Sequence, residues 1–243
     1  MTLSPFYIHS TPSTNVLLLE MTRSEELPEG FLLYTDFQTA GKGQPGNAWE
    51  SESGKNLLFS ILLYPHSIQV DRQFILSEIT SLTLKKVLEK YADDITIKWP
   101  NDIYWKNKKI AGILIENSLF RDRIDKCIIG IGLNVNQEKF MSNAPNPISL
   151  KQIVGTDINR EKLLMEIHVE LLEMYKNSSP EFIHHEYLKN LYRKKGYHTY
   201  IETATNVSFN AKTEDVLTDG RLVLRTDAEE ISSYYFKEIQ FVL

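Results

Sequence analysis

Two lysine-bearing stretches hold the residue types best suited to chemistry. Residues 36–49 form a glycine-rich loop that reads Asp-Phe-Gln-Thr-Ala-Gly-Lys-Gly-Gln-Pro-Gly-Asn-Ala-Trp. The second stretch begins with Lys98-Trp99-Pro100-Asn101-Asp102 and continues, seven residues after Asp102, with Lys109-Ile110-Ala111-Gly112-Ile113-Leu114. Backbone N–H groups of a glycine-rich loop can converge on an anion, and a lysine adds positive charge. The two stretches together could therefore bring two anions into contact.

The loop Gly41–Gly46 fits the dinucleotide fingerprint G-x-G-x-x-G and follows a predicted strand. That fingerprint has to open a helix, because the helix N-terminus receives the pyrophosphate. Here Pro45 and the polar segment 47–55 lead to another predicted strand, so the context excludes a Rossmann site. Two interpretations remain for the loop: an anion-binding loop, or a surface loop with a solvated Lys42. Trp49 fits either a stacking surface for a nucleobase or core packing.

Lys98 and Lys109 also have structural alternatives. Lys98 ends an apolar strand, and because lysine is rarely buried without a partner, Asp102 could be that partner. Asp102 could instead help to hold Mg²⁺ on phosphates. Lys109 could be an edge-strand charge that opposes aggregation, while Gly112 would let a ligand approach the backbone closely.

Strands and helices in mixed order must position these residues. Five apolar runs predict strands, namely Phe31–Phe37, Asn56–Tyr64, Ile95–Trp99, Ile110–Glu116 and Cys127–Val135. Residues 105–108 predict the turn of a hairpin over Ile103–Glu116. Apolar residues at helical spacing predict helices at Val16–Met21, from Asp71 as N-cap to Tyr91, from Asn159 as N-cap to Met174, and at Phe182–Leu191. This order predicts an α+β fold with a mixed or antiparallel sheet.

The composition changes near residue 194, which predicts a main domain over 1–194 and a second domain over 195–243. The second domain shows short alternating runs and a tight-turn signal at Asp219-Gly220, which are typical of a small β-barrel. The expected strands lie near Val207–Ala211, Arg221–Thr226, Ser232–Phe236 and Ile239–Val242.

Composition excludes several classes of protein. The 243 residues are 42% hydrophobic and 24% charged, which is enough for a large core, and the net charge of −5 argues against nucleic-acid binding. Cys127 is the only cysteine, so there is no internal disulfide and no cysteine-rich zinc site, and we expect it to pack in the core. For His184 and His185 we expect surface or helix-capping roles rather than metal binding. Without a signal peptide or a long apolar run, we expect a cytoplasmic protein that makes no membrane contact.

In combination, these motifs resemble the biotin protein ligases, also called biotin–[acetyl-CoA-carboxylase] ligases. The matching segments, in family order, are Ser13-Thr14-Asn15, Gly41–Trp49, Lys98–Asp102, Lys109–Leu114 and Gly130–Asn134. The resemblance is strong over residues 5–135. It implies a catalytic domain with the mixed sheet of the biotin/lipoate ligases and a small C-terminal SH3-like β-barrel.

The resemblance also implies a reaction in two steps. The carboxylate of biotin attacks the α-phosphate of Mg·ATP, which gives biotinyl-5′-AMP and pyrophosphate. A lysine of the biotin carboxyl carrier protein of a biotin-dependent carboxylase then attacks the mixed anhydride and releases AMP. Both steps need cations and backbone donors where negative charge develops, and neither needs a side-chain nucleophile.

Residue roles follow from the resemblance by position. The implied biotin contacts are Ser13, Thr14, Asn15, Gln38, Lys42, Gly43, Gln44, Lys109, Gly112 and Gly132. The implied ATP contacts are Gly41, Lys42, Trp49, Lys98, Asn101, Asp102, Lys109 and Asn134. Lys109 and Lys42 are the implied catalytic residues, and Asp102 is the implied ligand of Mg²⁺.

The chain departs from the family pattern in its loop. Bacterial members carry several arginines where this chain has Lys42, Gln44, Pro45 and Asn47, and lysine lacks the bidentate fork of arginine. How firmly the loop retains the adenylate is therefore an open question. Some members also begin with a helix-turn-helix repressor domain. Because Ser13 arrives so early, we expect a ligase that does not bind operator DNA.

Three other functions compete with this interpretation. A lipoate–protein ligase adenylates another carboxylic acid but lacks the pairing of Lys98–Asp102 with Lys109–Leu114. A non-catalytic regulator that binds biotin or a nucleotide would have no need of all three lysines. A dinucleotide oxidoreductase ranks third because the fingerprint fails in context. Pairing of strand edges would allow a homodimer.

Overall fold

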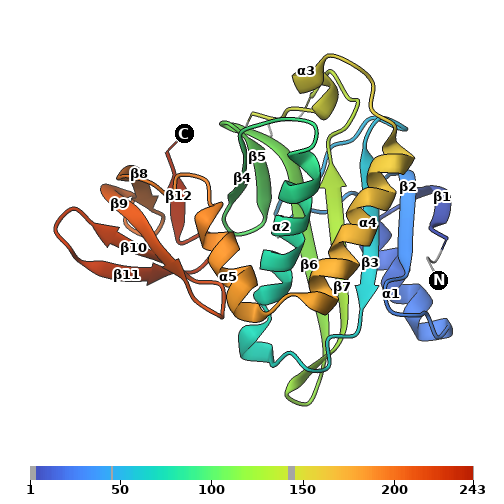
Figure 1. Cartoon of the computed structure of the whole chain (residues 1–243), viewed down its shortest axis with the longest axis horizontal. Coiled ribbons are helices and arrows are strands. Elements are labelled where there is room, and N and C mark those ends of the chain that lie inside the picture. Colours follow the sequence, from blue (N-terminus) through green and yellow to red (C-terminus); the bar gives the residue numbers. More distant parts are fainter. Residues whose placement is uncertain (1–3, 45, 142–145, 243) are drawn as a thin grey trace.

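The computed structural model describes residues 4–44, 46–141 and 146–242. Its main body is a seven-stranded sheet in the order β1-β2-β3-β7-β6-β5-β4 (Figure 1). The strands are β1 (Phe6–Thr11), β2 (Leu32–Gln38), β3 (Leu57–Leu63), β4 (Ile95–Lys98), β5 (Asp102–Trp105), β6 (Lys108–Phe120) and β7 (Arg123–Leu133). Strands β1 and β2 are parallel and the other neighbours are antiparallel. The predicted mixed sheet, the α+β class and the β5–β6 hairpin are thus confirmed.

Helices cover both faces of this sheet. They are α1 (Thr14–Ser24), α2 (Ile75–Leu88), α3 (Leu150–Val154), α4 (Arg160–Asn177) and α5 (Pro180–Lys189). Strand β3 is buried along its whole length, and its side chains alternate between two cores. Phe59 and Ile61 belong to the core that includes residues of α2 and α4, whereas Leu62 packs with Leu18 of α1. Figure 1 shows α2 and α4 lying side by side over one face.

The two predicted helix caps have different outcomes. Asn159 is confirmed as the N-cap of α4, since its Oδ1 accepts a hydrogen bond of 2.9 Å from the backbone N–H of Lys162. Asp71 is wrong as a cap. It lies in a separate 3₁₀ turn, Val70–Arg72, and α2 begins at Ile75 without a side-chain cap. Three residues, Arg72 to Phe74, separate Asp71 from the first residue of the helix, so its side chain is too far along the chain to cap it.

The C-terminal part of the chain forms a five-stranded antiparallel sheet in the order β11-β10-β9-β8-β12. Its strands are β8 (His198–Glu202), β9 (Val207–Val216), β10 (Leu222–Thr226), β11 (Ile231–Tyr234) and β12 (Ile239–Phe241). The four expected strands are confirmed, and β8 is an additional one. No pairing among the described residues closes this sheet into the expected barrel. The domain boundary at residue 194 stays a prediction.

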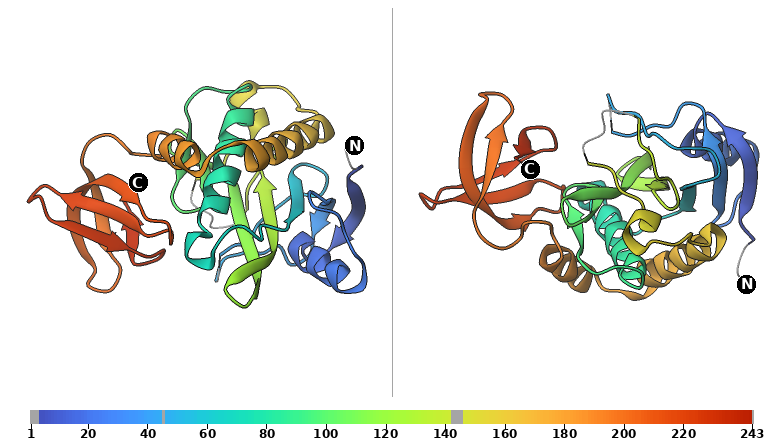
Figure 2. Two further views of the ribbon diagram at one scale, coloured as in Figure 1. Left: turned by 60° about the horizontal axis from the view of Figure 1, so that its bottom comes forward. Right: turned by 90° about the horizontal axis from the view of Figure 1, so that it is seen from above.

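The second sheet lies beside the end of the first that carries β4 and β5 (Figure 2). Trp99 donates a hydrogen bond of 2.8 Å from Nε1 to the carbonyl of Gly220. His184 of α5 lies between two carboxylates, with Nδ1 2.9 Å from Glu78 and Nε2 3.1 Å from Asp215 of β9. His184 is partly exposed, as expected of a surface residue, but it is not a helix cap, and the tertiary fold brings an acidic side chain from each of two distant elements to its ring.

None of the helices in the described part of the chain combines the length and apolar composition of a membrane span.

Candidate active site

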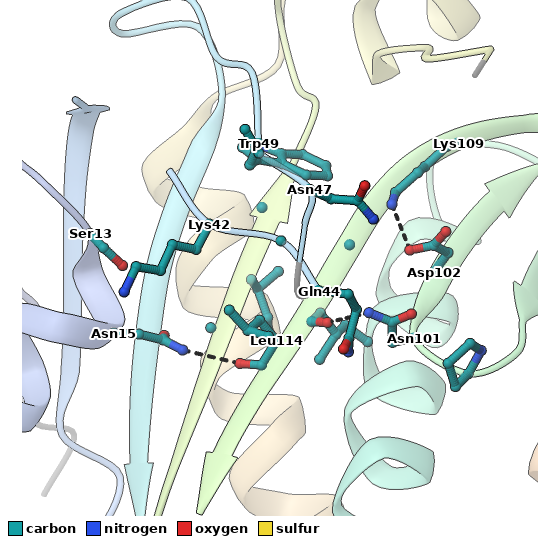
Figure 3. Close-up of a pocket in the computed structure, with 18 of the residues that line it drawn as sticks. Ser13, Asn15, Lys42, Gln44, Asn47, Trp49, Asn101, Asp102, Lys109 and Leu114 are labelled. Carbon is teal, nitrogen blue, oxygen red and sulfur yellow. Dashed lines mark hydrogen bonds and ion pairs between the residues drawn. The ribbon is translucent and has the colours of Figure 1, made fainter. Parts of the chain in front are cut away.

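A pocket lies between α1, the glycine-rich loop, and the turn that joins β4 to β5 (Figure 3). Side chains alternate along β6 and β7, so Gly112, Leu114, Gly130 and Gly132 share the face opposite the one that Ile129 contributes to the α2 core. The predicted site residues that line the pocket are Ser13, Thr14, Asn15, Gln38, Lys42, Gly43, Gln44, Trp49, Lys98, Asn101, Asp102, Lys109, Gly112 and Gly132. The fold thus gathers the residues of five separate sequence segments in one place.

Gly41 and Asn134 are the two predicted site residues that do not line the pocket. The carbonyl of Gly41 accepts a hydrogen bond of 3.0 Å from the backbone N–H of Trp49, which closes the base of the loop. A Cβ at Gly41 would lie 2.8 Å from the carbonyl oxygen of Trp49, so the backbone needs glycine there. Asn134 is only 3% exposed, and its Oδ1 has no hydrogen-bond partner among the described residues.

The glycine-rich loop folds back on itself as a small hairpin over the pocket. Lys42 and Ala48 form a β-bridge, and the N–H of Gly43 donates to the carbonyl of Asn47 at 3.0 Å. The Lys42 side chain is exposed and extends toward Ser13 (Figure 3). No helix follows the loop before β3, which agrees with the exclusion of a Rossmann site. Pro45 lies outside the described residues.

Trp49 lies flat against two glycines that face each other across β6 and β7. Gly112 and Gly132 are register partners. A Cβ at Gly132 would lie 2.4 Å from Cε2 of Trp49, and a Cβ at Gly112 would lie 2.9 Å from Cζ3. The close approach expected at Gly112 is therefore made here by an indole ring of the chain itself. The indole Nε1 is buried and has no hydrogen-bond partner within the described residues.

Lys109 forms an ion pair with Asp102, with a distance of 2.7 Å between Nζ and Oδ1 (Figure 3). Asp102 is opposite Gly112 in the β5–β6 register, and the missing side chain leaves room for Lys109 to reach it. Indeed a Cβ at Gly112 would lie 3.4 Å from the Lys109 ammonium. Asp102, suggested as a partner for Lys98, thus makes its ion pair with Lys109, and only its charge acts on Lys98. The ammonium of Lys109 also lies 5.6 Å from the centre of the Trp49 ring.

Lys98 lies among aromatic rings instead. Its ammonium is 5.2 Å from the ring centre of Tyr104 and 4.9 Å from that of Phe241, which belongs to β12 of the second sheet. Burial lowers the pKa of Lys98, the nearby charge of Lys109 acts in the same direction, and Asp102 opposes them. A partly desolvated cation of this kind interacts strongly with an anion that enters the pocket.

The turn that joins β4 to β5 is held to β6 by the backbone and side chain of Asn101. Asn101 donates from Nδ2 to the carbonyl of Ile113 at 2.7 Å, and the N–H of Ile113 donates to the carbonyl of Asn101 at 2.9 Å. These two hydrogen bonds hold the backbone near both lysines in place. No group of three or more His, Cys, Asp or Glu side chains that could hold a metal ion occurs in the part of the chain that the structure describes. Mg²⁺ needs few protein carboxylates when it binds with phosphates, so Asp102 alone is compatible with it.

The opposite end of the pocket is a hydrogen-bonded polar cluster, which we define as Thr14, Asn15, Gln38, Ser60 and Glu116. The backbone N–H of Thr14 donates to Gln38 Oε1 at 2.8 Å, and Thr14 Oγ1 lies 3.1 Å from the same oxygen. Ser60 Oγ lies 2.7 Å from Thr14 Oγ1 and 2.6 Å from Asn15 Oδ1. Asn15 Nδ2 donates to the carbonyl of Leu114 at 3.2 Å and to Glu116 at 2.7 Å.

Sequence reasoning missed Ser60 and Glu116 in this cluster. A signal was present, because Ser60 interrupts an otherwise apolar strand with a polar side chain that has to find a partner. Gly130 is also required here, since a Cβ at that position would lie 2.3 Å from Asn15 Oδ1. Asn47 and Phe236 line the pocket as well. Nothing local to Phe236 pointed to the site, because only the packing of the second sheet brings it there.

Comparisons with known proteins agree with this fold. A model of the biotin/lipoate A/B protein ligase family matches residues 7–134, which is more than half of the chain. The chain is 32% identical over 224 residues to the bifunctional ligase/repressor BirA of Bacillus subtilis, which covers 88% of this chain and 66% of that protein. It is 29% identical over 185 residues to the biotin–[acetyl-CoA-carboxylase] ligase of Mycobacterium tuberculosis, covering 72% of this chain and 66% of that protein.

Among solved structures, a biotin protein ligase from Aquifex aeolicus in complex with biotin and ATP superposes with a TM-score of 0.79. The two sequences are 24% identical, and the superposition covers 98% of this chain and 99% of that chain. The chain belongs to the biotin/lipoate A/B protein ligase family. It spans just under two thirds of the Bacillus subtilis relative, so its own substrates and partners are taken up below as a proposal.

Proposed function

We propose that this chain is an ATP-dependent biotin–protein ligase. It activates biotin as biotinyl-5′-AMP and transfers biotin to a lysine of the biotin carboxyl carrier protein of a biotin-dependent carboxylase. One observation carries most of the weight: Lys98 and the Lys109–Asp102 pair lie in the same pocket as a polar cluster of neutral donors and acceptors. A small polar ligand with a carboxylate tail would span these two ends.

The lysines account for the first step. The carboxylate of biotin and the α-phosphate of ATP repel each other, and Lys109 is placed to neutralise both. At an effective dielectric constant near 20, a cation ~4 Å from an anion gains about 4 kcal/mol before desolvation. Lys98, partly desolvated among aromatic rings, adds positive charge at the same end. Lys42 comes from the loop, whose exposed position lets it approach after the ligand has bound.

The remaining roles follow from position in the pocket. The polar cluster and Ser13 bind the bicyclic ureido head of biotin, with Gly43 and Gln44 covering it from the loop. Trp49 provides the surface for the adenine, and Asn134, whose buried Oδ1 has no hydrogen-bond partner among the described residues, would accept from the base once the site opens to it. Asp102 is the carboxylate that would hold Mg²⁺ on the phosphates, and a metal bound there would offset their charge.

Mass spectrometry of an acceptor tests this proposal directly. The protein is incubated with MgATP, an acceptor domain, and either biotin or lipoate. We expect a biotin-sized mass gain on the acceptor that falls at least about a hundredfold in Lys109→Ala. Lys108→Ala is the matched control, because Lys108 is the exposed neighbour on the same strand and should retain full activity. No biotin-dependent gain with a folded protein and a competent acceptor rules the proposal out.

Other outcomes of the same experiment identify the alternatives. A mass gain with lipoate but not with biotin identifies a lipoate ligase. Binding of biotin without any transfer identifies a non-catalytic regulator. The absence of operator-DNA binding, the homodimer and the cytoplasmic location stay predictions. Mobility-shift assays, sedimentation of the purified protein and cell fractionation, respectively, check them.

A further inference from the structure

Ser60 and Glu116 belong to the polar cluster but do not line the pocket. We propose that these two residues fix the direction in which the Thr14 hydroxyl donates, so that Thr14 presents an acceptor to the ligand beside a donor from Gln38. They are positioning residues, because they act through Asn15 and Thr14. The inference rests on the proposed function and adds to it a physical basis for choosing biotin over lipoate.

The chain of hydrogen bonds is anchored at its far end by Asn15. The Asn15 nitrogen Nδ2 lies 3.2 Å from the carbonyl of Leu114 and 2.7 Å from Glu116 Oε2. A backbone carbonyl and a carboxylate can only accept, so both contacts require the amide nitrogen at that side. The amide oxygen Oδ1 must then face Ser60. The amide cannot turn over without placing Oδ1 against both of these acceptors, which would lose both hydrogen bonds.

The number of hydroxyl protons then determines which oxygen donates in each contact. Ser60 and Thr14 have one hydroxyl proton each, whereas three oxygen–oxygen contacts join Asn15, Ser60, Thr14 and Gln38. Asn15 Oδ1 has no proton, so Ser60 must donate across the 2.6 Å contact. The 2.7 Å contact between the two hydroxyls then requires Thr14 to donate to Ser60. The contact left without a proton, between Thr14 and Gln38 Oε1, is the longest of the three at 3.1 Å.

Two hydrogen-bonding groups remain for a ligand. Because Ser60 donates its proton to Asn15, no described residue donates to the lone pairs of Thr14 Oγ1, and this oxygen is an acceptor for the ligand. Gln38 Oε1 is fixed by the backbone N–H of Thr14 at 2.8 Å, which leaves Gln38 Nε2 as a donor. A donor beside an acceptor matches a ligand edge with C=O next to N–H, as in a cyclic urea. The dithiolane ring of lipoate has neither group, so it would leave both protein groups unpaired.

Calorimetric titration of three ligands tests the inference without relying on catalysis. They are biotin and two analogues, in each of which oxygen replaces one of the two ureido N–H groups; only one of these N–H groups faces Thr14. We expect the wild type to bind biotin about tenfold more tightly than one of the two analogues. In Ser60→Ala, Thr14 is free to donate, so biotin should bind about tenfold more weakly and the preference should shrink to about twofold or less.

Ser81→Ala is the matched control, because Ser81 is equally buried, lies on α2, and has no hydrogen-bond partner among the described residues. Ser81→Ala should bind biotin and the two analogues as the wild type does. Glu116→Gln keeps an acceptor for Asn15 and should stay within about threefold of the wild type for biotin, whereas Glu116→Ala should weaken biotin as Ser60→Ala does. If Ser60→Ala does not fold, the two Glu116 variants carry the test.

A folded Ser60→Ala or Glu116→Ala that keeps the wild-type preference for biotin over the analogue overturns the inference. This result is distinct from failure of the proposed function, which would appear as a wild type that neither binds nor transfers biotin. A loss of biotin affinity in Glu116→Gln as large as in Glu116→Ala also contradicts the inference, because an amide oxygen can replace the carboxylate as an acceptor.

Discussion

The two ends of the pocket differ in how completely their polar groups are satisfied. At the polar cluster, contacts of 2.6–3.2 Å join Thr14, Asn15 and Ser60 to their neighbours. At the lysine end, the Lys98 ammonium lies against aromatic rings and forms no ion pair within the described residues, and Trp49 Nε1 and Asn134 Oδ1 are buried there without hydrogen-bond partners. Satisfied networks are rigid, whereas unpaired buried groups gain when a ligand pairs with them. One end is therefore preformed, and the other is completed by its ligand.

The same contrast appears in two glycines of β7 that are two residues apart. Gly130 is covered by Asn15, a buried side chain held by three partners. Gly132 is covered by the indole of Trp49, which comes from a loop. Both glycines leave no room for a Cβ, but only the second has a neighbour that can move away. The difference between the ends should therefore be measurable by one substitution made at two positions.

The largest effect on stability is expected from Gly130→Ala. Its Cβ would lie 2.3 Å from Asn15 Oδ1, and Asn15 cannot withdraw without breaking the polar cluster, so we expect a loss of about 2–3 kcal/mol in the free energy of unfolding. Gly132→Ala should displace Trp49 and remain within about 0.5 kcal/mol of the wild type. Denaturant unfolding measures both values, and Trp49 in Gly132→Ala should shift its fluorescence emission to the red.

Equal destabilisation by the two alanines contradicts the contrast between a preformed and a movable end. Wild-type fluorescence in Gly132→Ala would show that Trp49 stays in place and that the strand moves instead. Gly155→Ala is a useful reference, since a Cβ there meets no atom within 4 Å and its cost comes from the positive φ of 81° alone.

A smaller effect, and one confined to the lysine end, is expected from Lys98→Met. Methionine keeps most of the apolar stem against Tyr104 and Phe241 but removes the charge. Because the cation acts where phosphate charge develops, kcat should fall about tenfold to a hundredfold. The dissociation constant of biotin alone should stay within about twofold, since the polar cluster is untouched. An equal loss in kcat and in biotin affinity would mean that the two ends are not independent.

Much of the fold and of the site could be predicted from local sequence patterns. Apolar runs located the central strands, and the cap at Asn159 located α4, because both signals act over a few residues. The lysines stood out in the sequence because together they are hard to explain as structural residues, and the resemblance to the biotin protein ligases then implied the remaining pocket residues, Gly132 among them. The side-chain partners were harder. Asp102 pairs with Lys109 rather than Lys98 because Gly112 leaves a gap across the β5–β6 register, a property of strand pairing and not of spacing.

The contacts that sequence reasoning missed join segments far apart in the chain. Ser60 meets Asn15 across the face of the sheet, and Phe236 reaches the pocket from the second sheet. The role of His184 depends in the same way on α2, α5 and β9 lying together. Contacts of this kind can be identified only from the tertiary structure, because no periodicity or motif within a single segment indicates them.

His184 also links the second sheet to the main body, because its ring contacts Glu78 of α2 and Asp215 of β9. Burial acts to lower the pKa of His184, but the hydrogen bonds and charges of Glu78 and Asp215 outweigh it and raise this pKa above 6.5. Burial raises the pKa of Glu78, despite the opposing effect of His184. Both groups thus bind protons more tightly in the folded protein than in the unfolded chain. Stability from both is therefore present at acidic pH and declines as pH rises through the raised values.

The smallest effect is expected from His184→Gln, and it concerns pH rather than activity. For the wild type, the contribution of His184 to stability should be full below pH 6.5 and should be lost as the pH rises through its raised folded-state pKa. His184→Gln should remove this decline and lower Tm slightly at acidic pH, because the ring is partly exposed and solvent screens its contacts with the two carboxylates. His185→Gln is the matched control, because His185 is exposed. Melting curves across this range measure both, and an unchanged pH dependence in His184→Gln would mean that the Glu78–His184–Asp215 contact does not hold the second sheet in place.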